Sequence, residues 1–294
     1  MRFKINFLAV STLLFLISGI IRHDVDEQEY LNLAQQKQFE CVGQLFQDTT
    51  PTCTCVLIDN KYILTAAHCL TTFEKRYDTI KKGNQTITYF TYFNSLVIKP
   101  EKINLKFGNI KIKAKKITIH PLYNDTTLKG GNYDIAIIEL ETEINTISIP
   151  KLNKAFDEQN AQIIGIGFGA SGKANEPESI KAEYKKIAGQ NTIDRIEGRK
   201  YNGKKTWFTC DFDHPTNKKC NKTGDFKPLP LEYTPTGGDS GGGAFRFKNG
   251  EWELIGICPS AGVNMKQFYK TGYYGQIMNW HRVSVFADWI EKNK

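Results

Sequence analysis

Strand-length runs of apolar and β-branched residues, separated by turn residues, dominate the chain after its first fifty positions. Such runs predict half-buried or buried β-strands. They are CTCVLI (53–58), KYILTAA (61–67), QTITYFTYF (85–93), IKAKKITIH (112–120), DIAIIEL (134–140), AQIIGIGFG (161–169), WELIGICP (252–259) and GYYGQIM (272–278). A helical period appears only near the C-terminus, where Val285, Phe286, Trp289 and Ile290 share one face and Ser284 is available as a cap. The pattern predicts an all-β body with one C-terminal helix.

The N-terminal residues follow a different pattern. A short basic start (1–4) precedes the apolar run INFLAVSTLLFLISGII (5–21), in which Ser18 and Gly19 are small. This order is typical of a secretory signal peptide, and the run is short for a membrane span of about 20 residues. We expect residues 1–19 to be a signal peptide and residues 20–294 to form the mature domain, secreted or periplasmic. The alternative is an uncleaved anchor, the one case in which a membrane contact is expected.

Composition and charge narrow the function classes. The 294 residues are 40% apolar and 24% charged, as in ordinary globular domains. The net charge is +8, but basic runs such as KIKAKK (111–116) lack the interleaved aromatics of a nucleic-acid platform, so no nucleic-acid partner is expected. GFGASG (167–172) matches a dinucleotide-binding pattern, yet Pro177 follows it where a helix is required. No cofactor is expected.

The seven cysteines indicate disulfides, because the chain is predicted to be exported. They are Cys41, Cys53, Cys55, Cys69, Cys210, Cys220 and Cys258. The odd number leaves at least one unpaired or bonded to another chain. Cys210, His214 and Cys220 lack a fourth ligand at a zinc-site spacing, so no metal is expected.

Three segments carry the residue types of nucleophilic catalysis. LTAAHC contains His68, GNYDIAIIEL contains Asp134, and GGDSGGG contains Ser240. A serine hydroxyl needs a base to take its proton, and a carboxylate can orient that base. The glycines let the backbone bend so that the N–H groups of Gly238 and Ser240 converge on a developing oxyanion. The sequence therefore predicts a Ser-His-Asp triad with an oxyanion hole.

These motifs, in the order His, Asp, Ser, closely resemble the chymotrypsin-like (trypsin-like) serine protease family. ITIHPLYN (117–124), GIGFG (165–169) and HRVSVFADWI (281–290) resemble further segments of the family. The resemblance implies two packed, antiparallel six-stranded β-barrels with a C-terminal helix, the halves covering about 38–150 and 151–294. It also implies a disulfide between Cys53 and Cys69. We further expect a local Cys210–Cys220 bridge, with Cys41 facing Cys55 across neighbouring strands and Cys258 free.

The chain departs from the family pattern at several positions. Thr234 stands six residues before Ser240, where the family places the floor of its specificity pocket, so a preference for Lys or Arg is not expected. The Ile-Val-Gly-Gly activation motif is missing. We expect leader removal to expose Ile20 or Ile21, whose ammonium would pair with Asp239. The stretch between His68 and Asp134 carries an insertion around residues 74–106.

The predicted function is an exported serine endopeptidase, expected to be a monomer that acts on protein or peptide substrates. Two alternatives use the same residues. One is a catalytically weak or silent binding or adhesion protein on the protease scaffold. The other is an esterase-type acyl hydrolase.

Overall fold

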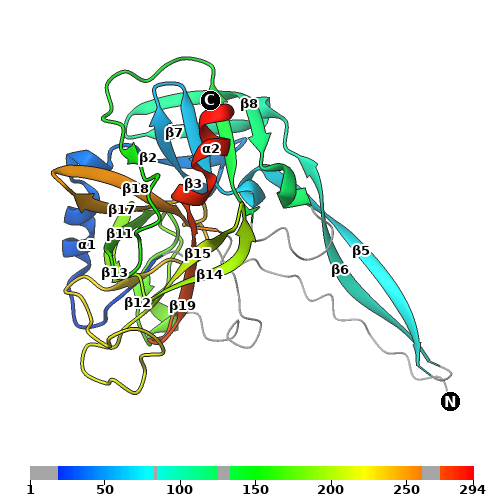
Figure 1. Cartoon of the computed structure of the whole chain (residues 1–294). Helices are drawn as coiled ribbons and strands as arrows, with labels where there is room; N and C mark the ends of the chain where they lie inside the picture. The colour runs from blue at the N-terminus through cyan, green and yellow to red at the C-terminus, as the bar shows by residue number, and fades with distance from the viewer. Residues whose placement is uncertain (1–18, 83–84, 125–132, 260–271) are drawn as a thin grey trace.

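The computed structural model describes residues 19–82, 85–124, 133–259 and 272–294. Figure 1 shows a β-rich body from which one long hairpin projects. Two β-sheet halves follow each other along the chain, and the C-terminal helix α2 (Val283–Lys292) ends the second half beside the first. The predicted all-β class with a C-terminal helix is confirmed.

The first half is a closed six-stranded barrel, as predicted. Its strands, in the order in which they pair, are β2 (Val42–Gln47), β3 (Thr50–Asp59), β4 (Tyr62–Thr65), β9 (Ala136–Leu140), β8 (Ile110–Ile119) and β7 (Ile103–Phe107). Strand β8 alternates between residues that face the barrel interior and residues that face solvent: Ile112 and Ala114 are buried, whereas Lys111 and Lys113 are exposed. Opposed apolar pairs such as Leu45 and Leu105 fill the interior.

The second half is an open, curled sheet in the described residues, not the closed six-stranded barrel that was expected. The pairing order is β13 (Ile187–Thr192), β11 (Gln162–Gly167), β17 (Gly243–Lys248), β18 (Glu251–Ile257), β19 (Ile277–Arg282), β15 (Lys204–Asp211) and β14 (Arg195–Tyr201), and β10 (Lys151–Leu152) pairs with β18. Only Ile193 and Asp194 separate the two edge strands, β13 and β14. The two edges of the curled sheet are therefore formed by consecutive strands of the chain. A closed barrel would have one continuous strand at this position, and here it is divided into β13 and β14.

The N-terminal residues are part of the core of the second half. Strand β1 (Ile20–Ile21) lies between β12 (Gly172–Lys173) and β16 (Tyr233–Thr234), and both isoleucines are buried. The helix α1 (Glu27–Ala34) follows and packs against β13. This helix was not predicted, although Asp26 caps it by accepting the N–H of Gln28 at 2.9 Å.

Helix α2 is confirmed, but its start differs from the prediction. The helix begins at Val283, and Arg282 holds the N-cap position. Ser284 lies inside the first turn, where its hydroxyl donates to the buried carboxylate of Glu158. The Ser284 hydroxyl, which was expected to cap the helix, is thus hydrogen-bonded to the Glu158 carboxylate instead.

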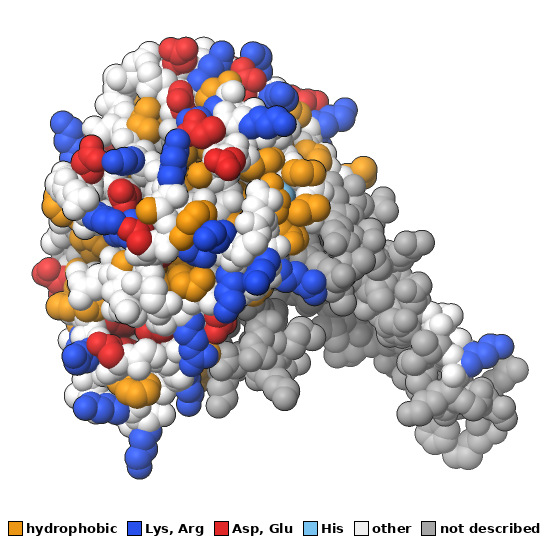
Figure 2. Space-filling model, in the orientation of Figure 1, with side chains coloured by type: hydrophobic (Ala, Val, Ile, Leu, Met, Phe, Trp, Pro, Cys, Tyr) orange, Lys and Arg blue, Asp and Glu red, His pale blue; other side chains and the backbone are white. Residues whose placement is uncertain are grey.

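The insertion between His68 and Asp134 forms a two-stranded arm. Strands β5 (Thr71–Lys82) and β6 (Gln85–Val97) pair antiparallel and extend away from the body (Figure 1). On the body, acidic and basic side chains are interspersed over the face seen in Figure 2. Within the described ranges, no helix has the length and hydropathy of a membrane span.

Candidate active site

His68 and Asp134 are joined by two hydrogen bonds. His68 lies in the short 3-10 helix η2 (Ala67–Leu70) after β4, and Asp134 lies just before β9. The Asp134 carboxylate accepts the backbone N–H of His68 at 2.8 Å, and its other oxygen lies 2.8 Å from the ring Nδ1. Because an ionised carboxylate only accepts hydrogen bonds, this contact favours the tautomer with the proton on Nδ1. Nε2 is left available to take a proton.

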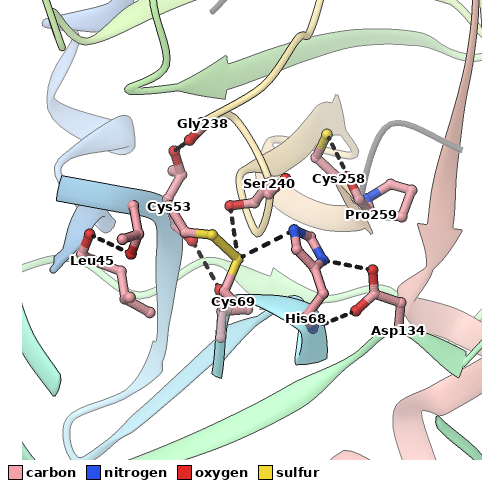
Figure 3. The surroundings of a disulfide bond; sticks show 12 residues. Leu45, Cys53, His68, Cys69, Asp134, Gly238, Ser240, Cys258 and Pro259 are labelled. Carbon is pink, nitrogen blue, oxygen red and sulfur yellow. Dashed lines mark hydrogen bonds and ion pairs between the residues drawn. A yellow bond between two sulfur atoms is a disulfide. The ribbon is translucent and has the colours of Figure 1, made fainter. Parts of the chain in front are cut away.

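Ser240 lies on the Nε2 side of the same ring. The Sγ atom of Cys69 is 3.8 Å from His68 Nε2 and 3.7 Å from the backbone oxygen of Ser240. In the view of Figure 3, Ser240 and Asp134 lie on opposite sides of the His68 ring. The structure thus brings together His68 and Asp134 from the first half and Ser240 from the loop between β16 and β17 of the second.

Glycines shape the loop around Ser240. Gly238 and Gly241 have positive φ angles of 97° and 82°. A Cβ on Gly238 would lie 2.7 Å from the Cα of Gly169, closer than real Cβ atoms come to backbone. Among the described residues, neither the Gly238 N–H nor the Ser240 N–H donates to a backbone acceptor.

Asp239 is a buried carboxylate held by backbone donors. It accepts the N–H of Gly169 at 3.1 Å and that of Thr236 at 3.0 Å, and the N–H of Gly19 also interacts with it. Burial raises the pKa of Asp239 to about 6, while the N–H donors act in the opposite direction. The backbone N–H that interacts with Asp239 thus belongs to Gly19, the residue before Ile20 and Ile21, which were the predicted partners of Asp239. The backbones of Ile20 and Ile21 pair instead with β12 and β16.

Thr234 lies in β16, paired with Ile20, and is buried. Its Oγ1 atom has no hydrogen-bond partner among the described residues. The chain reaches Pro259 after β18 and then enters residues 260–271, which lie outside the described ranges. The predicted role of Thr234 as the floor of a specificity pocket stays a prediction.

The disulfide between Cys53 and Cys69 is present, as predicted. The two sulfur atoms of this bridge and a ring nitrogen of His68 are potential metal-ligand atoms, and all three lie within 4.8 Å of one another. Disulfide sulfurs are not thiolate ligands, so this group is not a metal site of the oxidised protein.

The other predicted bridges are not formed. Cys210 and Cys220 are free, so the expected bridge between them is wrong. The physical reason is that Cys210 belongs to the apolar cluster around Phe208 and Trp280, whereas Cys220 packs against a different cluster.

Cys41 and Cys55 are also free thiols, as is Cys258. The N–H of Leu57 donates to the oxygen of Cys41, so Cys55 lies two residues from the position opposite Cys41. Diagonal neighbours are about 7–8 Å apart, beyond the usual Cα separation of a disulfide. The free state of Cys258 agrees with the prediction.

Sequence reasoning missed Thr54, a fully buried residue of β3 that contacts the Ser240 loop. Its hydroxyl donates to the oxygen of Gly238 at 2.9 Å, and its backbone N–H donates to the oxygen of Ser240 at 2.8 Å. The only signal in the sequence is its place beside Cys53, which does not reveal a contact with residues far along the chain.

Comparisons with known proteins show the family of the chain. Residues 32–290 match the Trypsin family model. The chain is 27% identical to the CLIP domain-containing serine protease B4 of Anopheles gambiae, covering 81% of this chain and 60% of that protein. It is 27% identical to Trypsin Tyr p 3.0101 of Tyrophagus putrescentiae, covering 83% and 73%, and 25% identical to the atrial natriuretic peptide-converting enzyme of Rattus norvegicus, covering 82% and 18%. The chain belongs to the trypsin family of chymotrypsin-like serine proteases, which are serine-type endopeptidases.

Proposed function

We propose that the protein is an exported endopeptidase in which Ser240 is the nucleophile, His68 the general base and Asp134 the group that orients the base. The observation that carries the proposal is the double contact between Asp134 and His68, with Ser240 on the free Nε2 side of the ring. His68 takes the hydroxyl proton as Ser240 attacks the scissile carbonyl. It then returns this proton to the leaving amine.

The same loop supplies the oxyanion hole in this proposal. The N–H groups of Gly238 and Ser240, neither of which donates to a backbone acceptor among the described residues, receive the negative charge that develops on the carbonyl oxygen. A donor of this kind typically contributes a factor of about 10² to 10³ in kcat. The positive φ of Gly238 is the backbone conformation that the role requires.

Export and activation are proposed together. The Cys53–Cys69 disulfide fits an oxidising compartment. The N–H of Gly19 interacts with Asp239, so we propose cleavage of the leader after Ser18, one residue earlier than the sequence suggested. The ammonium of Gly19 would then neutralise the buried carboxylate and order the loop that carries Ser240. Leader removal and activation would be one event.

Substrate choice is proposed from Thr234. A hydroxyl at the base of the pocket does not compensate a buried Lys or Arg side chain, so the residue before the cleaved bond is expected to be small, polar or apolar. Protein or peptide chains are the proposed substrates, and the protein is proposed to act as a monomer.

The test compares the processed protein with its Ser240→Ala variant. The wild-type protein is expected to react with a fluorophosphonate probe and to cleave a denatured protein mixture, and the variant is expected to do neither at equal thermal stability. Mass spectrometry of the new termini gives the residue preference. Labelling of Ser240→Ala at full strength would show that another residue is the nucleophile, and selective cleavage after Arg would contradict the Thr234 proposal.

The same experiment separates the two alternatives. A stable wild-type protein that does not react with the probe would favour the silent binding protein. A protein that reacts and hydrolyses small esters but leaves every peptide bond intact would favour the esterase.

A further inference from the structure

Thr54 contacts the Ser240 loop at two points. Its hydroxyl donates to the Gly238 oxygen at 2.9 Å, and its backbone N–H donates to the Ser240 oxygen at 2.8 Å. The three-residue turn from Gly238 to Ser240 is therefore held at both ends by one residue of the opposite half. Figure 3 shows Cys53, the neighbour of Thr54, close to both of these loop residues.

Thr54 is also tied to the segments on either side of the loop. Its hydroxyl oxygen accepts the N–H of Phe168 at 3.0 Å, from the end of β11. Its carbonyl oxygen accepts the hydroxyl of Thr65 at 2.9 Å, and Thr65 lies at the end of β4, three residues before His68. One fully buried threonine thus links the segment that carries the base to the loop that carries the nucleophile.

The bond to Gly238 bears on the oxyanion donors. The oxygen of Gly238 belongs to the peptide unit between Gly238 and Asp239, which lies between the two predicted donor N–H groups. The torsions on either side of that unit, ψ of Gly238 and φ of Asp239, contribute to how the two N–H groups are oriented relative to each other, so fixing the unit limits that orientation. Because Gly238 has no Cβ, its backbone has more conformational freedom than that of other residues, and the hydroxyl of Thr54 holds it in the observed conformation with positive φ.

We propose that Thr54 is a positioning residue, which holds the N–H groups of Gly238 and Ser240 in the orientation that stabilises the oxyanion. The proposal rests on the proposed endopeptidase function. Because Thr54 is fully buried, we place it outside contact with the substrate. It acts through the loop, so its loss should weaken binding of the transition state more than binding of the substrate.

The experiment measures kcat and KM on a peptide substrate for Thr54→Val and Thr54→Ser. Valine keeps the shape of threonine and removes the hydroxyl, whereas serine keeps the hydroxyl. We expect Thr54→Val to lower kcat about tenfold, the equivalent of one hydrogen bond of about 1.4 kcal/mol, with KM changed less than about twofold. Thr54→Ser is expected to restore most of kcat, and the rate of fluorophosphonate labelling should follow kcat.

The matched control is Thr209→Val. Thr209 is also a buried threonine whose hydroxyl donates one bond, at 2.8 Å to Asn279, but it lies in β15, outside the Ser240 loop. This control should lose thermal stability and keep the wild-type kcat. If Thr54→Val does not fold, Thr54→Ala removes the same hydroxyl with less crowding.

Two results would overturn the proposal. One is a valine or alanine variant that loses stability with an unchanged kcat. The other is a serine variant as impaired as the valine variant, since the hydroxyl would then not be the acting group. An inactive wild-type protein would instead contradict the proposed function, so the two failures are distinguishable.

Discussion

The backbone N–H of Gly19 interacts with the carboxylate of Asp239, the residue directly before Ser240. The contact joins two parts of the chain that are distant in sequence. It lies in a tight site, because a Cβ on Gly19 would come within 2.0 Å of the Tyr233 ring. A terminal glycine fits this site, and a larger residue requires the ring to move.

The first prediction follows from this contact. Active, naturally processed protein should begin at Gly19, because only there does a new ammonium meet Asp239. One extra alanine before Gly19 should lower activity strongly, since the charge moves away and leaves the buried carboxylate unpaired. N-terminal sequencing and active-site titration measure both effects. A fully active protein that begins well beyond Asp24 would contradict the model of activation.

The second prediction concerns Gly238. Gly238→Ala should lower kcat about 10² to 10³-fold, because alanine resists the φ of 97° and its Cβ would press on the Gly169 backbone. Gly203→Ala is the matched control: Gly203 also has positive φ, but a Cβ there meets nothing within 4 Å. Steady-state kinetics should show the loss only for Gly238→Ala. Equal kcat values for the two variants would contradict the proposed role of Gly238 in the oxyanion hole.

The third prediction is a count of thiols. The denatured, unreduced protein should react with iodoacetamide at five cysteines and retain one bridge, between Cys53 and Cys69. Replacing both bridged residues by alanine should lower the free energy of unfolding by about 3 kcal/mol, the expectation for a loop of this length. Peptide mapping gives the bonding and chemical denaturation gives the stability. Recovery of a peptide that joins Cys210 to Cys220 would contradict the structure.

The fourth prediction is a pH dependence of stability from a group of buried acids. Burial, together with the nearby carboxylates of Asp211, Asp194 and Asp225, raises the pKa of Asp213 to about 7. The pKa of Asp194 is also raised to about 7, first by burial and then by Asp211. A folded-state pKa above the unfolded value means that the folded protein binds more protons. Its free energy of unfolding should therefore decrease as pH rises from about 4 through about 7.

Asp213→Asn is the test of this group. The amide cannot ionise, so the variant should show a weaker decrease between pH 4 and pH 8 and be more stable than the wild type at pH 8. Asp288→Asn, at an exposed position of α2, should leave the pH profile unchanged. Thermal unfolding of both variants in the Ser240→Ala background avoids self-digestion. An identical pH profile for wild type and Asp213→Asn would refute the prediction.

The sequence by itself determined the features that depend on local pattern. Two-residue alternation marks strands such as β8, since side chains in a strand point to opposite faces, and the apolar spacing around Phe286 marks α2. The resemblance carried by His68, Asp134 and Ser240 implied the family and the Cys53–Cys69 bridge. The short helix α1 was missed because only Tyr30 and Ala34 of its eight residues are buried, which is too few to show a helical period.

The tertiary structure decided everything that depends on which distant segments meet. It split the closing strand of the second half into β13 and β14, and it separated Cys210 from Cys220 by placing them in different apolar clusters. It also chose Gly19 as the residue that reaches Asp239, and Thr54 as the one that holds the Ser240 loop. These contacts join residues more than a hundred positions apart. Their geometry follows from how the two halves pack. Neither the residue types nor their spacing along the chain indicates which distant residues come into contact.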